Sequence, residues 1–351
     1  MGLWLERKED MKKRGLRSSY EGEVMLERPR VVHSILDAND IARAVEGRYD
    51  LARPLRGELF RIGMNDVYSL RSDNARYAAR VYRAGWHSTD DVDYELAFLR
   101  HLGARELPVV APIPDRNGDY RFAVEASEGR RDVVLFRWVP GRPLTRAPSA
   151  ELARRAGALA AEIHRAGDDF RPHRQPRTTD YAGLLARELP CLLETLAHRP
   201  NDATYCAEAG RAIVAALKDV SAEKAPVGPV HGDMHAGNVF VTQDGDVTIM
   251  DFDNCGEGHY VEDLTCFRWS DARRGRDPSI ADAFIAGYEA VRPISRSERA
   301  LFPLFEAAKQ LWFMGGVASN VNAIGGAGFL DEGMERYVAP LREYMGRAMP
   351  A

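Results

Sequence analysis

The sequence predicts an α+β fold in two lobes, a small lobe built on an antiparallel β-sheet and a larger, mainly helical lobe. Two patterns support this prediction. Runs of alternating apolar and polar residues, separated by Gly, Asn and Asp turns, fill residues 55–83. From about Pro148 onward, apolar residues recur instead at the three- and four-residue spacing of amphipathic helices. A chain of 351 residues is long enough for two lobes that each have a core.

The first lobe is predicted to contain a short helix, several strands and a longer helix. Asp37 precedes apolar residues at helical spacing and is expected to cap the short helix. Asn117-Gly118 indicates the turn of a hairpin, and Pro140-Gly141 ends the last strand. Strands are predicted over 58–62, 67–71, 77–82 and 133–139, and the longer helix over 90–102.

The second lobe is predicted to be helical around one inserted hairpin. We expect a charge-rich, flexible extension over 1–29, a first lobe over 30–139 and a second lobe over 140–351. Helices are predicted over 149–166, 180–197, 204–220, 278–291, 297–319 and 331–346.

The composition restricts the location and the partners. A net charge of −4 gives no overall attraction to nucleic acid or to an anionic membrane. The four cysteines show no CxxC pair or regular spacing, and no signal peptide is evident, so reduced thiols in a cytoplasmic protein are expected. No apolar run approaches the length of a membrane span.

The most informative stretch is His231-Gly232-Asp233-Met234-His235-Ala236-Gly237-Asn238, followed by Asp251-Phe252-Asp253. Residues 239–242 and 247–250 are predicted as strands joined by a turn, which would bring Asn238 and Asp251 side by side. Phosphoryl transfer needs one carboxylate to orient a hydroxyl and two oxygen ligands for Mg²⁺. Asp233, Asn238 and Asp251 supply this set, so the stretch predicts a phosphotransferase.

Parts of this stretch have other interpretations. A lone Asp is more often a turn or cap residue. His231 and His235 could form a metal site, but no Cys or carboxylate lies near them at zinc spacing. A site formed by Cys255, His259 and Cys266 is also conceivable. The complete order of motif, hairpin and second Asp favours phosphoryl transfer over these alternatives.

Over most of residues 35–345 the chain resembles the aminoglycoside-phosphotransferase/choline-kinase superfamily, whose fold is bilobal and protein-kinase-like. Within that superfamily it is most similar to the stress-response kinases and type II homoserine kinases. The specific matches are HGDMHAGN, DFD and Glu262-Asp263-Leu264. Weaker matches are Gly63-Met64-Asn65, Arg80-Val81-Tyr82-Arg83, Glu95 and the run from Leu135 to Gly141.

The resemblance implies a role for each motif residue. Asp233 would be the catalytic base or would orient the acceptor hydroxyl, while Asn238 and Asp251 would hold Mg²⁺. The donor would be ATP, occasionally GTP, with its adenine bonded to the backbone near Arg137 and Val139. Phe136 and Ile249 are expected to form apolar walls for the purine.

The remaining motif residues are expected to cover the phosphates or to support the loop. Gly63 and Asn65 belong to the turn that would cover the phosphates, although it is not a GxGxxG motif. Asp253 is either a second metal ligand or a brace of the loop. Asp263 is expected at a helix start, bonded to the catalytic-loop backbone. His231 and His235 are expected to brace the loop rather than to transfer protons.

One departure from the wider kinase pattern concerns a lysine. Kinases use a strand lysine to contact the phosphates and to pair with a helix glutamate. Here Arg80 occupies the strand position, and no lysine lies between residues 14 and 217. Arginine keeps the charge and offers a two-pronged fork, so we expect it to pair with Glu95 and clamp phosphate oxygens. A catalytically inactive nucleotide-binding protein is the alternative that this replacement leaves open.

The acceptor is less defined. Only twelve positions separate Asp251 from Asp263, so the long activation loop of a regulated protein kinase is missing. This favours a small hydroxylated acceptor such as a sugar, amino alcohol, hydroxy amino acid or antibiotic. A Ser/Thr protein kinase of the stress-response type is the alternative.

Charge gives a further hint about the acceptor. Residues 226–351 carry 18 acidic residues against 11 Lys and Arg, a net charge of −7. Either an acidic cleft suits a cationic acceptor, or this is an ordinary solvated surface. Plausible acceptor contacts are His259, Trp269, Asp271, Glu306, Gln310 and Phe313.

Overall fold

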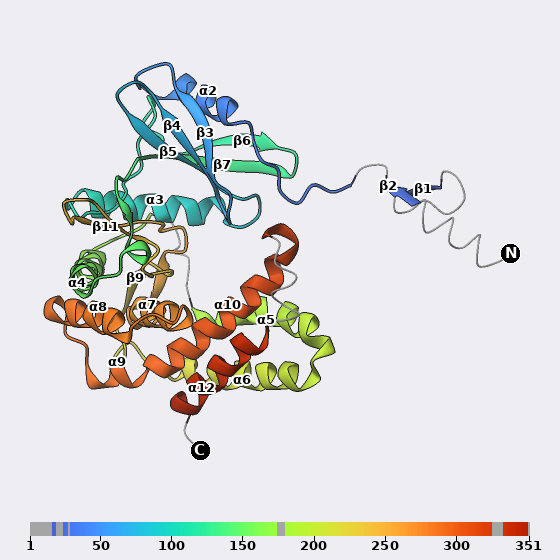
Figure 1. The fold of residues 1–351 in the computed structure, drawn as a ribbon, viewed down its shortest axis with the longest axis vertical. Helices are drawn as coiled ribbons and strands as arrows, with labels where there is room; N and C mark the ends of the chain where they lie inside the picture. The colour runs from blue at the N-terminus through green and yellow to red at the C-terminus, as the bar shows by residue number, and fades with distance from the viewer. Residues whose placement is uncertain (1–15, 19–23, 27–28, 174–179, 325–332, 350–351) are drawn as a thin grey trace.

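The computed structural model describes residues 16–18, 24–26, 29–173, 180–324 and 333–349. A small lobe containing a β-sheet stands above a larger helical lobe (Figure 1). Away from both, β1 (Leu16–Ser18) and β2 (Val24–Leu26) pair as an antiparallel hairpin. Apart from these strands and Pro29, the expected extension over 1–29 lies outside the described residues. The architecture confirms the predicted α+β fold class.

The sheet of the first lobe has five antiparallel strands in the order β3-β4-β5-β7-β6. The helix α2 (Ala38–Arg48), capped by Asp37 as predicted, packs against the sheet, and α3 (Thr89–Gly103) lies between the sheet and the helical lobe (Figure 1). The strands are β3 (Arg56–Arg61), β4 (Asp66–Arg71), β5 (Arg76–Val81), β6 (Phe122–Ala126) and β7 (Gly129–Arg137).

Alternation along β5 and β7 decides which side chains face the second lobe. Ala79 and Val81, with Val133 and Leu135, pack in the core beneath α2. Because successive side chains of a strand point to opposite faces, Arg80 on β5 points the other way, toward α3. The sheet therefore presents the Arg80 guanidinium to the space between the lobes.

The second hairpin of the sheet differs from its prediction. Asn117-Gly118 does form a turn, with Gly118 at φ +87°, but no paired strands flank it. β6 and β7 pair instead across Ser127 and Glu128. Before β6, Pro112 makes a single bridge to Phe136 on β7. The apolar residues around Pro112 belong to a connecting segment that leans on the sheet rather than to a strand.

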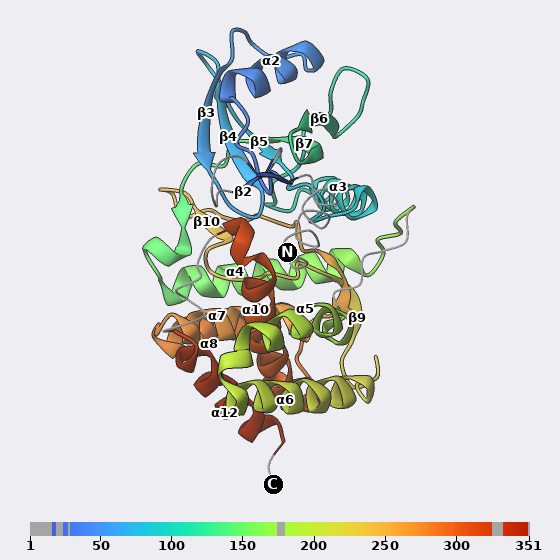
Figure 2. The ribbon, with the colours of Figure 1, turned by 90° about the vertical axis from the view of Figure 1, so that its right-hand side faces the viewer.

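The helical lobe follows the predicted order closely. Figure 2 shows α4 directly beneath the sheet lobe and α6 at the far end. Among the described residues, every helix is too short or too polar to cross a bilayer. The helices are α4 (Ala150–Gly167), α5 (Tyr181–Thr195), α6 (Pro200–Lys218), α7 (Val261–Arg273), α8 (Pro278–Val291), α9 (Arg296–Ala300), α10 (Phe302–Ile324) and α12 (Glu335–Ala348).

Two helical segments depart from the prediction. The helix expected over 297–319 divides into α9 and α10, because Pro303 lacks an N–H and is tolerated only in the first turn of a new helix. The sequence places a helix start at Asp263 but gives no extent, whereas α7 continues to Arg273. Nearly all of α7 is buried, so it lacks the one-sided apolar pattern that reveals a surface helix.

Short strands build the base of the cleft between the lobes. β10 (Val239–Val241) and β11 (Val247–Ile249) form the predicted hairpin, and β8 (Arg142–Pro143) pairs with β10. β9 (Val227–Val230) pairs with β12 (Gly256–His259). Single 3₁₀ turns lie at Leu144–Arg146 and Leu196–His198. β12 therefore lies in the middle of the short segment from Asp251 to Asp263.

Helices α4 and α8 approach each other at glycines. A Cβ added to Gly157 on α4 would lie 1.8 Å from the Phe284 carbonyl oxygen, and one on Gly287 would lie 1.9 Å from that of Arg154. Backbone cannot yield as a flexible side chain can, so these glycines permit the close packing of the two helices beneath the cleft.

We expect Gly157→Ala to lower the free energy of unfolding by about 1–3 kcal/mol, because the added methyl forces α4 and α8 apart. Urea denaturation followed by far-UV circular dichroism measures this. The matched control is Gly47→Ala on α2, where a Cβ meets nothing within 4 Å and helix propensity favours alanine. Equal midpoints for Gly157→Ala and the wild type would contradict the close-packing argument.

Candidate functional site

Two adjoining cavities lie where the lobes meet. The larger, of about 320 Å³, is lined by residues of both lobes that include Gly63, Asn65 and Asp233. The smaller, of about 150 Å³, lies between the sheet and the β10–β11 hairpin. Arg80 and Asp251 line both. Most of the predicted motif residues therefore converge on one connected space.

The β10–β11 hairpin joins the two halves of the motif. The Met250 N–H donates to the Asn238 carbonyl over 2.9 Å, which brings Asp251 beside Asn238. The Asn238 Nδ2 donates to the Asp233 carbonyl over 3.0 Å. This contact leaves the Asn238 side-chain oxygen as the atom available for a cation. Asp251 has a φ of +70°, a left-handed conformation that is uncommon outside glycine and that clusters at functional sites.

Gly232 has a conformational reason to be glycine. Its φ is +78°, and a Cβ there would lie 2.2 Å from the Asn254 carbonyl oxygen. Any larger residue would push the loop before Asp233 away from the segment that follows Asp253. The glycine of the motif therefore holds the two carboxylate-bearing segments together.

The two histidines of the motif have tautomers fixed by their partners. His231 Nδ1 accepts from the Asp233 N–H at 3.2 Å, so its Nε2 donates to the Met250 carbonyl at 2.9 Å. His235 Nδ1 accepts from the Gly237 N–H at 2.9 Å, so its Nε2 donates toward Asp233 Oδ2, 3.4 Å away. His231 is fully buried. Both side chains therefore brace the loop through their ring nitrogens.

Asp263, in the first turn of α7, fixes the backbone before Asp233. Its Oδ2 accepts from the His231 N–H at 2.7 Å and its Oδ1 from the Gly232 N–H at 2.9 Å. His164 on α4 contacts the same carboxylate at 2.9 Å and bonds Tyr288 on α8 at 2.8 Å. Burial opposes ionisation, but His164, His231 and the backbone donors hold the pKa of Asp263 below its usual value.

Arg80 links the sheet, α3 and the hairpin. Its Nη1 lies 2.7 Å from Glu95 Oε1, and its Nη2 lies 3.4 Å from Asp251 Oδ1. The other Glu95 oxygen accepts from the Tyr82 hydroxyl at 2.6 Å. The guanidinium also lies over the Phe136 ring, 4.9 Å from its centroid. The predicted Arg80–Glu95 pair is present, and Arg80 reaches the cavity.

Lys309 on α10 was not among the predicted site residues. Its side chain is 1% exposed, and Nζ lies 3.1 Å from Asp233 Oδ1 and 3.3 Å from the Gly232 carbonyl. Although burial works against ionisation, Lys309 and His235 hold the pKa of Asp233 well below its usual range. The sequence does distinguish this residue: Lys309 is the only lysine after residue 224, and every other long cationic side chain in that part of the chain is an arginine.

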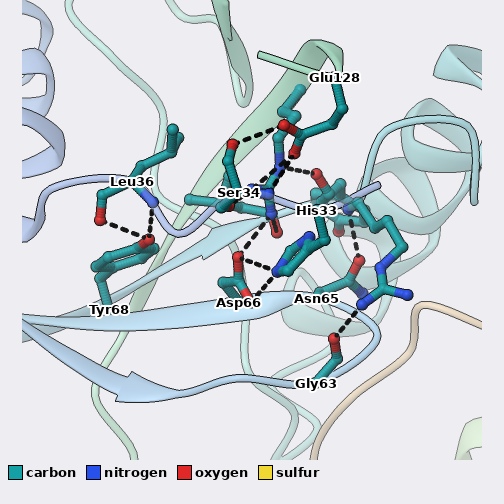
Figure 3. A network of polar contacts seen from close by, with 12 residues as sticks. His33, Ser34, Leu36, Gly63, Asn65, Asp66, Tyr68 and Glu128 are labelled. Atoms are coloured by element: carbon teal, nitrogen blue, oxygen red, sulfur yellow. Dashed lines mark hydrogen bonds and ion pairs between the residues drawn. The ribbon is translucent and has the colours of Figure 1, made fainter. Parts of the chain in front are cut away.

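The turn of residues 63–66 is held by a buried polar network that Figure 3 shows from close by. Asp66 is fully buried and lies 2.8 Å from Arg131 and 3.1 Å from His33. Asn65 accepts from the Arg83 N–H at 3.2 Å, and the Gly63 carbonyl accepts from the Arg83 guanidinium at 3.1 Å. The turn is therefore held in position by side chains of its own lobe.

Asn65 also crosses to the second lobe. Its Nδ2 donates to Asp253 Oδ2 over 2.8 Å. The same carboxylate oxygen lies 3.6 Å from His87 Nε2, and Asn254 donates to the other oxygen at 2.9 Å. Asp253 therefore acts as a brace in this structure, while its position in the wall of the larger cavity keeps it near the carboxylates of Asp233 and Asp251.

The smaller cavity has apolar walls that could enclose a flat ring. Arg137 and Val139, on the segment between the lobes, line it together with Phe136, Phe240 and Met250. Ile249 does not line it, contrary to the expectation. Because strand side chains alternate, Ile249 points into the core of the second lobe, and the next residue, Met250, supplies the wall.

Of the six expected acceptor contacts, two line the larger cavity and four are bonded elsewhere. Trp269 and Phe313 line the larger cavity. Asp271 and Glu306 are buried in ion pairs with arginines, and Gln310 accepts from the Trp269 indole at 2.7 Å. His259 bonds the Ala225 carbonyl at 2.8 Å. The described residues contain no cluster of three or more His, Cys, Asp and Glu side chains arranged for a metal ion, including one at Cys255, His259 and Cys266.

A sequence profile of the phosphotransferase enzyme family (APH) matches residues 60–301, which include every predicted site residue from Gly63 to Asp263. An uncharacterized protein of Deinococcus radiodurans is 33% identical over 324 residues, covering 88% of this chain and 93% of that protein. A homoserine kinase of Neisseria meningitidis serogroup B is 28% identical over 249 residues, which covers 70% of this chain and 76% of that protein.

Solved structures share the fold. A microcompartment-associated aminopropanol kinase superimposes with a TM-score of 0.74 at 20% identity, covering 89% of this chain and 99% of its own. The amicoumacin kinase hAmiN, solved with AMP-PNP, Ca²⁺ and Ami, superimposes with a TM-score of 0.71 at 16% identity, covering 88% and 94%. These likenesses confirm the protein-kinase-like architecture.

We expect Asp263→Asn to lower the free energy of unfolding by about 1–3 kcal/mol, because an amide places an N–H₂ group against two buried backbone donors. Urea titration gives the value. Asp277→Asn is the matched control, since Asp277 also accepts a backbone N–H, at the exposed start of α8, where Asn caps equally well. Equal stability of the two variants would show that Asp263 does not fix the loop.

Proposed function

We propose, since this chain belongs to the phosphotransferase enzyme family, that it transfers the γ-phosphate of Mg²⁺-bound ATP to a hydroxyl group of a small molecule. The observation that carries the proposal is the convergence of Asp233, Asn238 and Asp251 on the two adjoining cavities, with Arg80 and Lys309 bound to two of the carboxylates. The four cysteines are free thiols, which favours a cytoplasmic location.

In this proposal the two lobes divide the work. Residues 30–139 bind the nucleotide, with its base in the smaller cavity and its phosphates beneath Gly63 and Asn65. Arg137 and Val139 lie beside the base, where a backbone edge offers it a carbonyl and an N–H. Residues 140–351 supply the catalytic loop and hold the acceptor. ATP and GTP differ only in the purine base that would lie against this backbone edge. We therefore infer ATP as the donor from the family.

The donor set fits a magnesium ion. The Asn238 side-chain oxygen and the Asp251 carboxylate are hard oxygen ligands on the two ends of one hairpin. Mg²⁺ in such sites is held by one or two protein oxygens together with substrate phosphates, so no larger cluster of protein ligands is required. When bound, the metal neutralises charge that develops on the phosphates.

Asp233 meets the acceptor hydroxyl. The hydroxyl oxygen forms a bond to the γ-phosphorus while the bond to the bridging oxygen breaks and ADP leaves, and the hydroxyl proton passes to Asp233. A carboxylate whose pKa is held far below its usual range is a weak base. Its main contribution is therefore to orient the hydroxyl, with the His235 N–H and the Lys309 ammonium fixing its two oxygens.

Arg80 and Lys309 balance the charge of the reacting groups from two sides. Arg80 contacts Asp251, the residue nearest the nucleotide pocket, while Lys309 contacts Asp233 on the acceptor side. Preorganised cations of this kind stabilise the negative charge that spreads over the transferring group. Arg80 thereby serves the purpose of the usual strand lysine, and Lys309 adds a second cation from a different element.

A small acceptor fits the space. The segment between Asp251 and Asp263 is short and contains β12, which pairs with β9, so it leaves no room for the long activation loop that holds a peptide acceptor. Relatives named homoserine kinase and neighbours named aminopropanol kinase have small hydroxylated acceptors in their names, which supports the same class here. Sugars, amino alcohols, hydroxy amino acids and antibiotics remain the set of acceptors to test.

We expect Asp233→Asn to lower the rate of ADP release with a hydroxylated acceptor by about 10²–10⁴-fold, because the amide no longer orients and deprotonates the hydroxyl. Binding of Mg²⁺·ATP, measured by calorimetry, should remain, since Asn238 and Asp251 are untouched. Full activity of the variant would show that the motif is misassigned. Phosphorylation of a protein substrate, with none of a small-molecule panel, would identify a protein kinase instead.

We expect Lys309→Met to lower kcat by about 10²-fold, because it removes a buried cation beside the transferring group. Nucleotide affinity should change little, since Lys309 does not line the smaller cavity. The control is Lys224→Met, which removes an equal charge from an exposed site. Thermal midpoints of both variants establish that they are folded. An unchanged kcat in folded Lys309→Met would exclude this role.

A further inference from the structure

The charges around the larger cavity are unevenly distributed. The carboxylates in its wall are those of Asp233, Asp251 and Asp253, all at the phosphate centre. Beyond them, the wall formed by α7 and α10 carries cations from Arg273, Arg274 and Lys309. Although residues 226–351 have a net charge of −7, their described acidic side chains do not line this part of the cavity. An acidic cleft for a cationic acceptor is therefore absent from this wall.

Arg273 is held in position but has no anionic partner. Its guanidinium lies over the Phe313 ring at 4.6 Å and over the Trp269 ring at 5.2 Å. Within the part of the chain that the structure describes, it makes no hydrogen bond or ion pair, and its Nε is buried without a partner. Stacking uses the face of a guanidinium and leaves its in-plane N–H fork available, the geometry that binds a carboxylate with two hydrogen bonds.

Arg274 adds a second positive charge beside it. Its guanidinium donates to the Ser270 carbonyl at 3.2 Å and to the Ser270 hydroxyl, and no carboxylate of the described residues pairs with it. Burial lowers the pKa of Arg274, and neighbouring Arg273 and Arg276 lower it further. Arg276 differs, because it pairs with Asp271 at 2.5 Å. Of these three arginines at the end of α7, the two that lack a carboxylate partner among the described residues are the two that line the cavity.

The aromatic side chains here do not form a cage for a cationic ligand. Such a cage needs free ring faces, but Arg273 covers faces of Phe313 and Trp269, and Lys309 lies 4.4 Å from the centroid of Trp312. A cationic acceptor would meet the positive charges of Arg273 and Arg274, which no carboxylate of the described residues pairs with, whereas the charge of Lys309 is paired with Asp233. The carboxylate of Glu306, which could oppose them, is buried and paired with Arg268.

The nucleotide does not account for these arginines. Neither Arg273 nor Arg274 lines the smaller cavity that suits the base. The path from that cavity passes Arg80 and Asp251, which both cavities share, before it reaches the wall of α7 and α10. The arginines therefore lie on the far side of the phosphate centre, where the acceptor enters.

We propose that the acceptor is a hydroxylated acid, and that Arg273, assisted by Arg274, binds its carboxylate while its hydroxyl lies at Asp233. This inference rests on the proposed function, since it assigns the acceptor of the same reaction. One unpaired guanidinium fork matches one carboxylate, whereas amino alcohols and aminoglycosides bring only positive charge to a wall that is already cationic.

The test uses pairs of acceptors that differ only by a carboxylate: L-homoserine against 3-amino-1-propanol, L-serine against ethanolamine, and L-threonine against 1-amino-2-propanol. Phosphorylation of each is followed in the wild type, Arg273→Gln, Arg273→Lys and the control Arg211→Gln, which removes an equal charge from an exposed position on α6. KM is measured separately for acceptor and for ATP.

In the wild type we expect at least one acid of the panel to be phosphorylated, with its decarboxylated partner used at least 10-fold less well. Arg273→Gln should raise KM for that acid by about 10- to 100-fold and leave KM for ATP unchanged. Arg273→Lys keeps the charge but loses the fork, so it should restore only part of the affinity. Arg211→Gln should behave as the wild type.

Other outcomes overturn the proposal. Equal or better use of the amino alcohols would show that the arginines do not select an acid. A rise in KM for ATP alone would place Arg273 on the nucleotide. Use of none of the six compounds by a protein that binds Mg²⁺·ATP would exclude a small hydroxy acid of this type. Failure to bind Mg²⁺·ATP would count against the proposed function itself and is read from the same calorimetric control.

Discussion

The arrangement of the site depends on one buried carboxylate, that of Asp263. It accepts the N–H groups of His231 and Gly232, and His164 joins it to Tyr288 on α8. An ionised carboxylate has two oxygens that only accept, so it can satisfy several such donors in a space closed to water. The loop before Asp233 and the helices α4, α7 and α8 thereby meet at one point, and the loop that carries Asp233 starts from a fixed position.

Charge compensation is the second constraint on the site. Three carboxylates face one cavity, and like charges in a partly buried space repel unless cations lie among them. Arg80 and Lys309 supply part of that compensation permanently, each from a secondary-structure element packed in the core. Arg80 on β5 and Lys309 on α10 approach the carboxylates from opposite lobes. Their positions are fixed by the packing of these two elements.

The sequence predicted what depends on short stretches of chain. Asn238 and Asp251 flank one hairpin and Asp233 lies in the loop just before it, while the Arg80–Glu95 pair follows from strand alternation and one helix. The wall of the smaller cavity was assigned to Ile249 instead of Met250 because one register step reverses the face of a strand. Lys309 and Arg273 were missed because they belong to no motif: their significance arises only when α7 and α10 pack beside the loop.

Helix α7 connects the two ends of the acceptor space. Asp263 in its first turn anchors the catalytic loop, and Arg273 ends it ten residues later, about 15 Å further along the axis at 1.5 Å per residue. A nearly fully buried helix cannot bend or slide independently of its surroundings. The helix therefore fixes the distance and the relative direction of its two ends: inserting or deleting one residue within it would rotate Arg273 by about 100° relative to Asp263 and shift it by about 1.5 Å along the axis.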